Sequence, residues 1–323
     1  MGQGDDGSPG LRPMADVENV PFKPIRKSAF MNYKKCPKKF WFSYFIHPDD
    51  YWNYNEKAGE NEAAAKGDIF HAEVDDFFRR IDYELVYELG DYNKIYEYFR
   101  NNFSYSETYE TNKTDIDEWF DWFCEVEARR LLFFKTNYTK SEFLEYYPPK
   151  QTEWNVTMTD EIDRTGHIDR VDYLPKEKAY AIVEYKTGRS YDPDRPTNLT
   201  MLRAECAFYA IILNEAKLVD HPVHYWALYN PQLKKFYIEK FPAATMRAVN
   251  NTYKGLIQKI KEAGDFPRNI SPLCMWCDFR RECFHGIEGE NKKYLFPDLV
   301  PVPIKNNYII PHDEVEIDEY DIE

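Results

Sequence analysis

The chain has 323 residues, with 42 Lys and Arg against 56 Asp and Glu, which gives a formal net charge of −14. Hydrophobic residues make up 43% and charged residues 30%, a composition typical of a folded globular protein and not of a disordered or fibrous one. No apolar run reaches the roughly 18 residues of a membrane-spanning helix, and GxxxxGK[ST] does not occur. The spacing GxGxxG occurs once, as GQGDDG (2–7), but in the predicted leader and not after a predicted strand, so we expect no membrane segment, no nucleotide cofactor and no ATP-driven motor.

Residues 1–20 are predicted to be a disordered leader. They lack the pattern of a secretory signal, so we expect an intracellular protein, cytoplasmic or nucleoid-associated. The first half of the chain after this leader is predicted to be mainly helical. Ser28 is placed to cap a short helix, and Pro37 suits the first turn of the next one. Residues 62–103 have apolar positions at helical spacing and read as helix. After a polar break, Thr114 begins another amphipathic helix.

From about residue 143 the pattern changes to the alternation that is typical of strands. Strands are predicted over 154–158, 166–173 and 178–187, a helix over 199–216, a hairpin over 221–230 and 234–241, and a last helix over 243–263. This order predicts an α/β fold with a mixed central sheet, in which a helical region of about 72–140 is inserted before the sheet. We expect one domain over 21–290, followed by an extended acidic tail over 291–323, whose last eleven residues carry seven acids and either solubilise the chain or bind a partner.

The segment from Asn19 to Pro48 has the opposite charge bias. It contains no Asp or Glu, several interleaved aromatic rings and seven bases: Lys23, Arg26, Lys27, Lys34, Lys35, Lys38 and Lys39. Positive charge with exposed rings would suit a groove for single-stranded nucleic acid, in which Lys34, Lys35, Lys38 and Lys39, with Arg189 farther along the chain, contact phosphates. The alternative is an amphipathic helix whose rings form core while its lysines face water.

Two segments carry charged residues on predicted strands: GHIDRVD (166–172) and AIVEYKTG (181–188). Because side chains alternate along a strand, Glu184 and Lys186 project to the same face, and Asp169 on the neighbouring strand can meet Glu184. Two carboxylates that converge there repel each other unless a cation lies between them, and oxygen ligands favour Mg²⁺ or Mn²⁺. Lys186 could then position a metal-associated water. The alternative is a surface Glu–Lys pair beside an unrelated Asp.

These two segments together resemble the nuclease core of the PD-(D/E)XK superfamily, in its RecB-like branch. KGDIFH (66–71) resembles the histidine motif of this branch, and RAECAFYA (203–210) resembles its QxxxY motif, with Glu205 where the family usually has Gln. The resemblance covers residues from about 23 to 286. It implies a restriction-endonuclease-like core, metal ligation by His71, Asp169, Glu184 and the Tyr185 carbonyl, and catalytic-site roles for Lys186, Glu205 and Tyr209.

Six cysteines occur, and three of them form the pattern Cys274-x2-Cys277-x5-Cys283, with Cys36 as a remote fourth candidate. Four thiolates suit either zinc or an iron–sulfur cluster. A single distant cysteine with a C-terminal triplet resembles the iron–sulfur nucleases, which include CRISPR-associated RecB-like exonucleases, exonuclease V and AddB-type subunits. That resemblance implies a [4Fe-4S] cluster, with zinc as the second choice and His285 as a substitute ligand. Cys124 and Cys206 are expected to be buried and not to bind metal.

The resemblance implies a Mg²⁺- or Mn²⁺-dependent DNA exonuclease that prefers single-stranded ends, leaves 5′-phosphates and acts in repair or recombination. Any motor would be a separate helicase chain. Two alternatives remain open: a CRISPR-adaptation nuclease that trims spacer precursors with an integrase partner, and a non-catalytic iron–sulfur DNA-binding subunit.

Overall fold

The computed structural model describes residues 22–45, 62–103, 113–262 and 264–285. The predicted leader (1–20) and the acidic tail (291–323) lie outside the described residues. In the described part of the chain, no helix is both long enough and apolar enough to cross a membrane.

A mixed sheet forms the centre of the fold, as predicted. In the described part of the chain its strands are β1 (Ile25–Arg26), β2 (Gln151–Met158), β3 (Arg164–Leu174), β4 (Ala179–Tyr185), β5 (Val223–Asn230) and β6 (Lys235–Lys240). The strand order is β1-β3-β4-β5-β6, with β2 beside β3. β3 is antiparallel to β2 and β4, β5 is antiparallel to β6, and the pairs β1–β3 and β4–β5 are parallel.

β1 and β4 lie on the same edge of β3. β2 pairs with residues 164–171 of β3 along one edge. β1 pairs with 164–165 and β4 with 170–174, and several of these residues also pair with β2, so both strands must occupy the opposite edge. Residues 166–169 have no partner from another described strand on that edge. The site described below lies at this gap.

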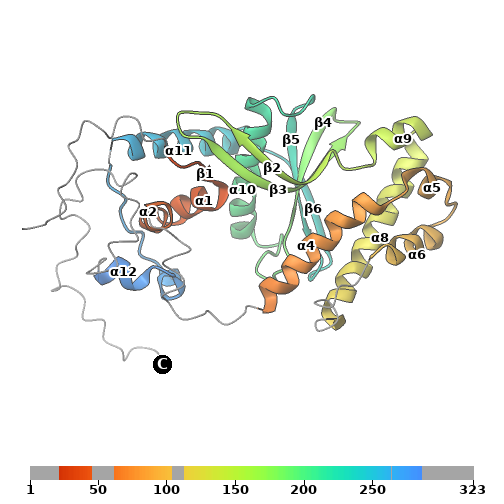
Figure 1. Ribbon diagram of the computed structural model, residues 1–323, viewed down its shortest axis with the longest axis horizontal. Helices are drawn as coiled ribbons and strands as arrows, with labels where there is room; N and C mark the ends of the chain where they lie inside the picture. Colours follow the sequence, from red (N-terminus) through yellow and green to blue (C-terminus); the bar gives the residue numbers. More distant parts are fainter. Residues whose placement is uncertain (1–21, 46–61, 104–112, 263, 286–323) are drawn as a thin grey trace, which may run out of the picture.

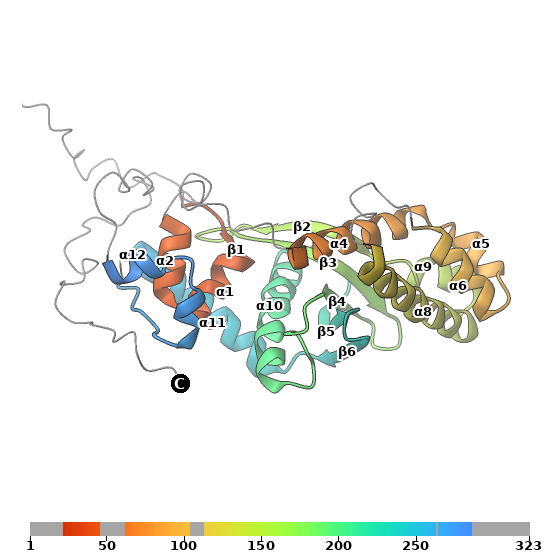
Figure 2. The ribbon, with the colours of Figure 1, turned by 90° about the horizontal axis from the view of Figure 1, so that it is seen from below.

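Helices cover both faces of the sheet (Figure 1). The helices of one core cluster are α1 (Lys27–Lys35), α2 (Pro37–Phe45), α10 (Pro196–Glu215) and α11 (Ala243–Lys261). Those of the second cluster are α4 (Glu62–Arg80), α5 (Tyr83–Glu88), α6 (Tyr92–Asn101), α8 (Lys113–Asn137) and α9 (Lys140–Tyr146). The molecule is elongated: α1, α2 and α12 (Arg280–His285) lie towards one end, and α5 and α6 towards the other (Figure 2).

The alternation along β4 explains this layered arrangement. Tyr180 and Ile182 pack in the cluster of α10 and α11, whereas Val183 and Tyr185 pack in the cluster of α4 and α8. Because successive side chains of a strand point to opposite faces, an almost continuous apolar strand requires helices on both sides. Glu184 therefore lies on the face that α10 covers.

Two local predictions are wrong. The helix predicted over 62–103 is divided into α4, α5 and α6, because the side chains of Asp82 and Asp91 accept hydrogen bonds from backbone N–H groups and start new helices there. Ser28 does not cap α1: this helix begins at Lys27 and has Arg26 at its N-cap position, without a side-chain cap. The short parallel pairing of β1 with β3 ends at Arg26 and places the start of the helix earlier.

Candidate active site

Three carboxylates face one another across neighbouring strands at the middle of the sheet. Glu153 on β2 lies between two residue pairs of constant register, which places it opposite Asp169 on β3. Glu184 on β4 follows the last β3–β4 pair, and the register places it opposite Asp169 on the other side. The side chains of Asp169 and Glu184 are almost completely buried, at 8% and 2% exposure. The predicted convergence of these two carboxylates is thus consistent with the strand register.

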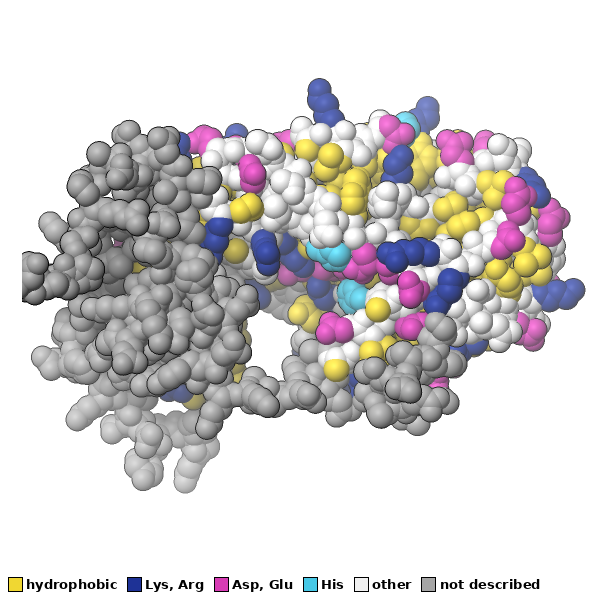
Figure 3. Space-filling view, viewed as in Figure 1, with side chains coloured by type: hydrophobic (Ala, Val, Ile, Leu, Met, Phe, Trp, Pro, Cys, Tyr) yellow, Lys and Arg dark blue, Asp and Glu magenta, His cyan; other side chains and the backbone are white. Residues whose placement is uncertain are grey.

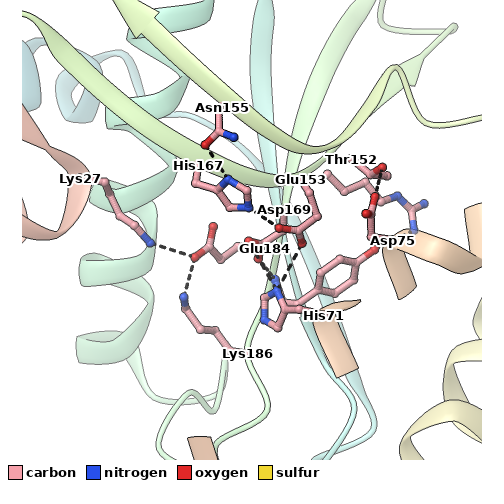
Figure 4. A network of polar contacts seen from close by, with 12 residues as sticks. Lys27, His71, Asp75, Thr152, Glu153, Asn155, His167, Asp169, Glu184 and Lys186 are labelled. Atoms are coloured by element: carbon pink, nitrogen blue, oxygen red, sulfur yellow. Dashed lines mark hydrogen bonds and ion pairs between the residues drawn. The ribbon is translucent and has the colours of Figure 1, made fainter. Parts of the chain in front are cut away.

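Glu153 has an unusual backbone conformation. Its φ angle is 45°, in the left-handed region that few residues other than glycine adopt. Such backbone strain persists where the surrounding structure holds it, and it is common at functional sites. One carboxylate oxygen of Glu153 lies 3.7 Å from His71 Nδ1, and the other contacts His167 Nε2. His167 is held in turn by Asn155, whose Oδ1 is 2.9 Å from His167 Nδ1 (Figure 4).

His71, on α4 of the second helical layer, lies next to the carboxylates of Asp169 and Glu153. Its Nδ1 atom lies 3.7 Å from Asp169 Oδ1 as well as 3.7 Å from Glu153. Together His71, Glu153 and Asp169 place their ligand atoms within 4.8 Å of one another, a spacing at which they could bind one metal ion. The other oxygen of Asp169 accepts a hydrogen bond of 2.8 Å from the backbone N–H of Tyr185, which leaves Oδ1 directed towards the histidine.

Glu184 is held by two lysines. Its Oε1 atom accepts hydrogen bonds from Lys186 Nζ at 2.5 Å and from Lys27 Nζ at 3.2 Å. Both ammonium groups also lie 3.6 Å from Glu205 Oε2 on α10. Glu184 Oε2 is buried and has no hydrogen-bond partner among the described residues. A buried oxygen without a partner is costly in a folded protein, and a cation would satisfy it.

The pKa shifts of Asp169, Glu184 and His71 also indicate a cation site. Burial and the negative charge of Glu184 raise the pKa of Asp169. Burial also opposes ionisation of Glu184, but the positive charges of Lys186 and Lys27 outweigh it and lower the pKa of this carboxyl group. For His71, burial favours the neutral ring, but the contacts with Glu153 and Asp169 raise its pKa overall. The site thus has an excess of negative charge close to Asp169, as a cation site requires.

The second residue of the helix motif, Tyr209, packs under β3 at Gly166. A Cβ atom at position 166 would lie 2.4 Å from Cε1 of the Tyr209 ring, so only glycine leaves room for this contact. Lys27 Nζ lies 5.3 Å from the centre of the same ring. The glycine of GHIDRVD and the tyrosine of RAECAFYA are therefore parts of one packing contact that fixes α10 beside the carboxylates.

On the opposite face of β3, a buried ion-pair network supports the site from behind. Arg170 donates to both oxygens of Asp172 at 2.7 and 2.6 Å and to Glu127 of α8 at 2.7 Å. It also donates to the Tyr185 hydroxyl at 3.3 Å. Buried charges are tolerated when they are paired in this way. The network joins α8 to the strands that carry Asp169 and Glu184.

These contacts bring together most of the predicted site residues: His71, Asp169, Glu184, Tyr185, Lys186, Glu205 and Tyr209. Histidine and acidic side chains gather at the middle of one face, flanked by Lys and Arg (Figure 3). The residues that fit a hard divalent ion are His71, Glu153, Asp169 and Glu184, which offer one imidazole and several carboxylate oxygens. Sequence reasoning missed Glu153, although Glu153 and Asn155 form the polar face of the strand whose apolar face was recognised.

The predicted nucleic-acid residues are more dispersed. Lys35 and Arg189 are exposed, Lys34 is half-buried, and Lys39 forms an ion pair of 3.2 Å with Asp278. Lys38 is buried, with its Nζ 5.2 Å from the centre of the Trp41 ring. Most rings of the basic segment are buried in the core, among them Phe30, Phe40, Trp41 and Phe45. Of the two interpretations of this segment, the second therefore holds for most of its rings, which form core between α1, α2 and their neighbours.

Cys36, at the end of α1, lies near the C-terminal cysteine segment. The backbone N–H of Asn269 donates to Cys36 Sγ at 3.4 Å, and Cys274 Sγ is 3.9 Å from the carbonyl oxygen of the same residue. Burial raises the pKa of Cys283 to about 11, and the nearby thiols of Cys36 and Cys277 also raise it. In the described part of the chain, however, the cysteines form no group of three placed to bind one metal ion. Cys124 and Cys206 are buried, as expected.

Comparison with known proteins agrees with this geometry. The sequence pattern of the PD-(D/E)XK nuclease superfamily matches residues 27–284, most of the chain. No curated protein gives a match. A solved structure described as "Crystal structure of SSO0001" is 13% identical and covers 65% of this chain and 100% of its own, with a TM-score of 0.28. A likeness at that level carries no argument about the site.

Proposed function

As the chain belongs to the PD-(D/E)XK nuclease superfamily, which implies metal-dependent nuclease activity, we propose that it hydrolyses phosphodiester bonds of DNA at the site of Asp169, Glu184 and Lys186, with Mg²⁺ or Mn²⁺. One observation carries the proposal. Glu184 has one oxygen bound by two ammonium groups, while its other oxygen is buried and has no hydrogen-bond partner among the described residues. A carboxylate held in this way is ready to bind a cation.

In this mechanism His71, Asp169, Glu184 and the Tyr185 carbonyl would hold the cation, and Glu153 is a further candidate ligand. A bound divalent ion supplies Lewis acidity and lowers the pKa of a coordinated water. Lys186 Nζ, 2.5 Å from Glu184 Oε1, is positioned to orient the attacking water and to stabilise the negative charge that develops on the phosphate. Glu205 and Tyr209 set the position of α10 beside these groups.

We place the chain in the RecB-like branch and expect it to act on single-stranded ends, as an exonuclease in repair or recombination. The position of His71 supports this placement, because α4 brings the histidine of the predicted upstream motif to 3.7 Å from Asp169. A helicase that separates strands would be a different chain, since this sequence has no ATP-binding loop.

We also propose that Cys36, Cys274, Cys277 and Cys283 hold a [4Fe-4S] cluster, with zinc as the second choice. The contacts of Asn269 with both Cys36 and Cys274 support it, because they bring the remote cysteine to the C-terminal segment. Such a cluster would tie α1 and α2 to η2 (Pro272–Trp276) and α12.

The direct test uses purified protein, Mn²⁺ and end-labelled DNA in single- and double-stranded form. We expect degradation of the single strand, no cleavage with EDTA, and a loss of about 100-fold or more in rate for Lys186→Met. Lys254→Met is the matched control, since Lys254 is an exposed lysine on α11 and should cut like wild type. If Lys186→Met cleaves as fast as the control, or no nucleic acid is cut, the proposal is wrong.

A further inference from the structure

Lys27, near the start of the described chain, contacts the active site although it is far in sequence from the other site residues. It directly follows β1, whose parallel register with β3 places it level with Gly166, at the gap between β1 and β4. Its side chain is 21% exposed, with Nζ 3.2 Å from Glu184 Oε1 and 3.6 Å from Glu205 Oε2. From sequence, Lys27 was only one of seven bases in a segment expected to contact phosphates.

Lys27 and Lys186 make equivalent contacts. Each ammonium group lies next to the same two oxygen atoms, Glu184 Oε1 and Glu205 Oε2. Two lysines and two glutamates thus alternate around a small ring (Lys27, Lys186 and Glu184 are drawn in Figure 4). Because both donors bind one oxygen of Glu184, the other oxygen is left for the cation. Among the described residues, Glu205 Oε2 has no hydrogen-bond partner, and its distance of 3.6 Å to each of these ammonium groups is too long for a good hydrogen bond.

The formal charges of the site give a reason for the presence of both Lys27 and Glu205. The four carboxylates are Glu153, Asp169, Glu184 and Glu205, and the two ammonium groups are Lys27 and Lys186. When all four carboxylates are ionised, as they would be around a bound cation, and the histidines are neutral, the excess of two negative charges equals the charge of one divalent ion. In this sum Glu205 contributes one negative charge and Lys27, whose Nζ lies 3.6 Å from it, contributes one positive charge.

We propose that Lys27 and Glu205 are a compensating charge pair of the active site, in which Lys27 acts as a second positioning ammonium group that balances Glu205 and holds Glu184 for the cation. The inference rests on the proposed function. Without Lys27 the site keeps one negative charge too many, so it binds the cation more tightly and the DNA phosphate more weakly. Without the charge of Glu205 both effects are reversed. Loss of both charges restores the balance.

The test is a double-variant cycle of Lys27→Met, Glu205→Gln and both together, in the full chain. Calorimetry with Mn²⁺ alone should show tighter binding for Lys27→Met and weaker binding for Glu205→Gln, each by about three- to tenfold, from Coulomb's law in a partly hydrated site. KM for single-stranded DNA should rise in the first variant and fall in the second. The double variant should return to within about threefold of wild type in both measurements.

Controls separate this role from simple packing. Lys27→Arg keeps the charge and should bind Mn²⁺ like wild type, and Lys254→Met changes an exposed lysine elsewhere and should have no effect. If both single variants weaken Mn²⁺ binding, or if the losses add in the double variant, the compensating pair is refuted while the nuclease proposal stands. A wild-type protein that binds Mn²⁺ and cuts DNA, but in which Lys27→Met changes neither measurement, refutes it too. A wild-type protein that neither binds Mn²⁺ nor cuts DNA refutes both.

Discussion

Replacing Asp169 by asparagine should make the metal-free protein more stable near neutral pH, although the residue is buried at the centre of the site. Burial and the charge of Glu184 raise the pKa of Asp169 to about 7, from an ordinary value of 3.8. In the folded protein Asp169 thus holds its proton in a range where the unfolded chain has lost it. Its contribution to stability is fully present below about pH 4 and is lost as the pH rises to 7.

The magnitude follows from the size of the shift. About three pKa units, at roughly 1.4 kcal/mol each, give a penalty of up to about 4 kcal/mol above pH 7. Asparagine has nearly the same shape, can still accept the hydrogen bond from the Tyr185 N–H and carries no charge, so it removes the penalty. For a chain of this size, 4 kcal/mol corresponds to about 6 °C in melting temperature.

The assay is thermal or urea unfolding in EDTA between pH 4.5 and 8, for wild type, Asp169→Asn and Asp172→Asn. Asp172 is the matched control, because it is also buried on β3 but its carboxylate pairs with Arg170 and Arg130. Burial raises its pKa, but the two guanidinium groups outweigh that effect and lower it. Its charge therefore stabilises the fold at neutral pH, and Asp172→Asn should lose stability there.

Adding Mn²⁺ at pH 7.5 should reverse the order of wild type and Asp169→Asn, because a bound cation removes the repulsion in wild type and the variant lacks a ligand. The reasoning is refuted if Asp169→Asn in EDTA at pH 7.5 is destabilised as strongly as Asp172→Asn. It is refuted equally if the wild-type stability does not fall between pH 4.5 and 7 relative to Asp169→Asn.

Three further outcomes follow from the structure. Glu153→Gln should weaken Mn²⁺ binding by about tenfold or more in calorimetry, since Glu153 contributes to the His71–Asp169 group, and unchanged affinity would remove it from the site. Gly166→Ala should cost about 1–3 kcal/mol in urea unfolding, because its Cβ would lie 2.4 Å from the Tyr209 ring, whereas Gly255→Ala on α11, with open space around it, should be neutral or stabilising. Equal stability of these two variants would contradict the packing argument. Anaerobically purified wild type should be brown, with absorbance near about 400 nm, and Cys36→Ala should lose it while Cys206→Ala keeps it; a colourless wild type would exclude the cluster.

Much of the site was predictable because its residues follow local rules. The spacing of Glu184 and Lys186 on one strand determines that both point to one face. The apolar runs on either side predicted the strands, and their short turn predicted that Asp169 would lie beside Glu184. The prediction of His71 as a site residue rested on the resemblance of its motif to the family. No local pattern of the sequence shows that α4 would place it next to Asp169.

One residue of the site that sequence reasoning missed depends on long-range structure. Glu153 lies on the polar face of its strand, but only the register of β2 on β3 places it opposite Asp169, with its carboxylate near His71, and no local propensity predicts its left-handed backbone. The rings of the basic segment show the same limit: charge and aromatic content left open whether they stack on bases or form core, and only the packing of α1 and α2 shows that most of them are buried.

The sequence by itself predicted the fold class and the meeting of Asp169 with Glu184 and Lys186, because alternation and short turns act between near neighbours in the chain. The superfamily came from the resemblance of its motifs and is shown by the family match over residues 27–284. Only the tertiary structure decided that Lys27 would stand beside Glu184, 157 residues away. That contact exists because β1 and β4 share one edge of β3, and the order of strands on an edge is settled by the packing of the whole sheet and not by the residues of any one strand.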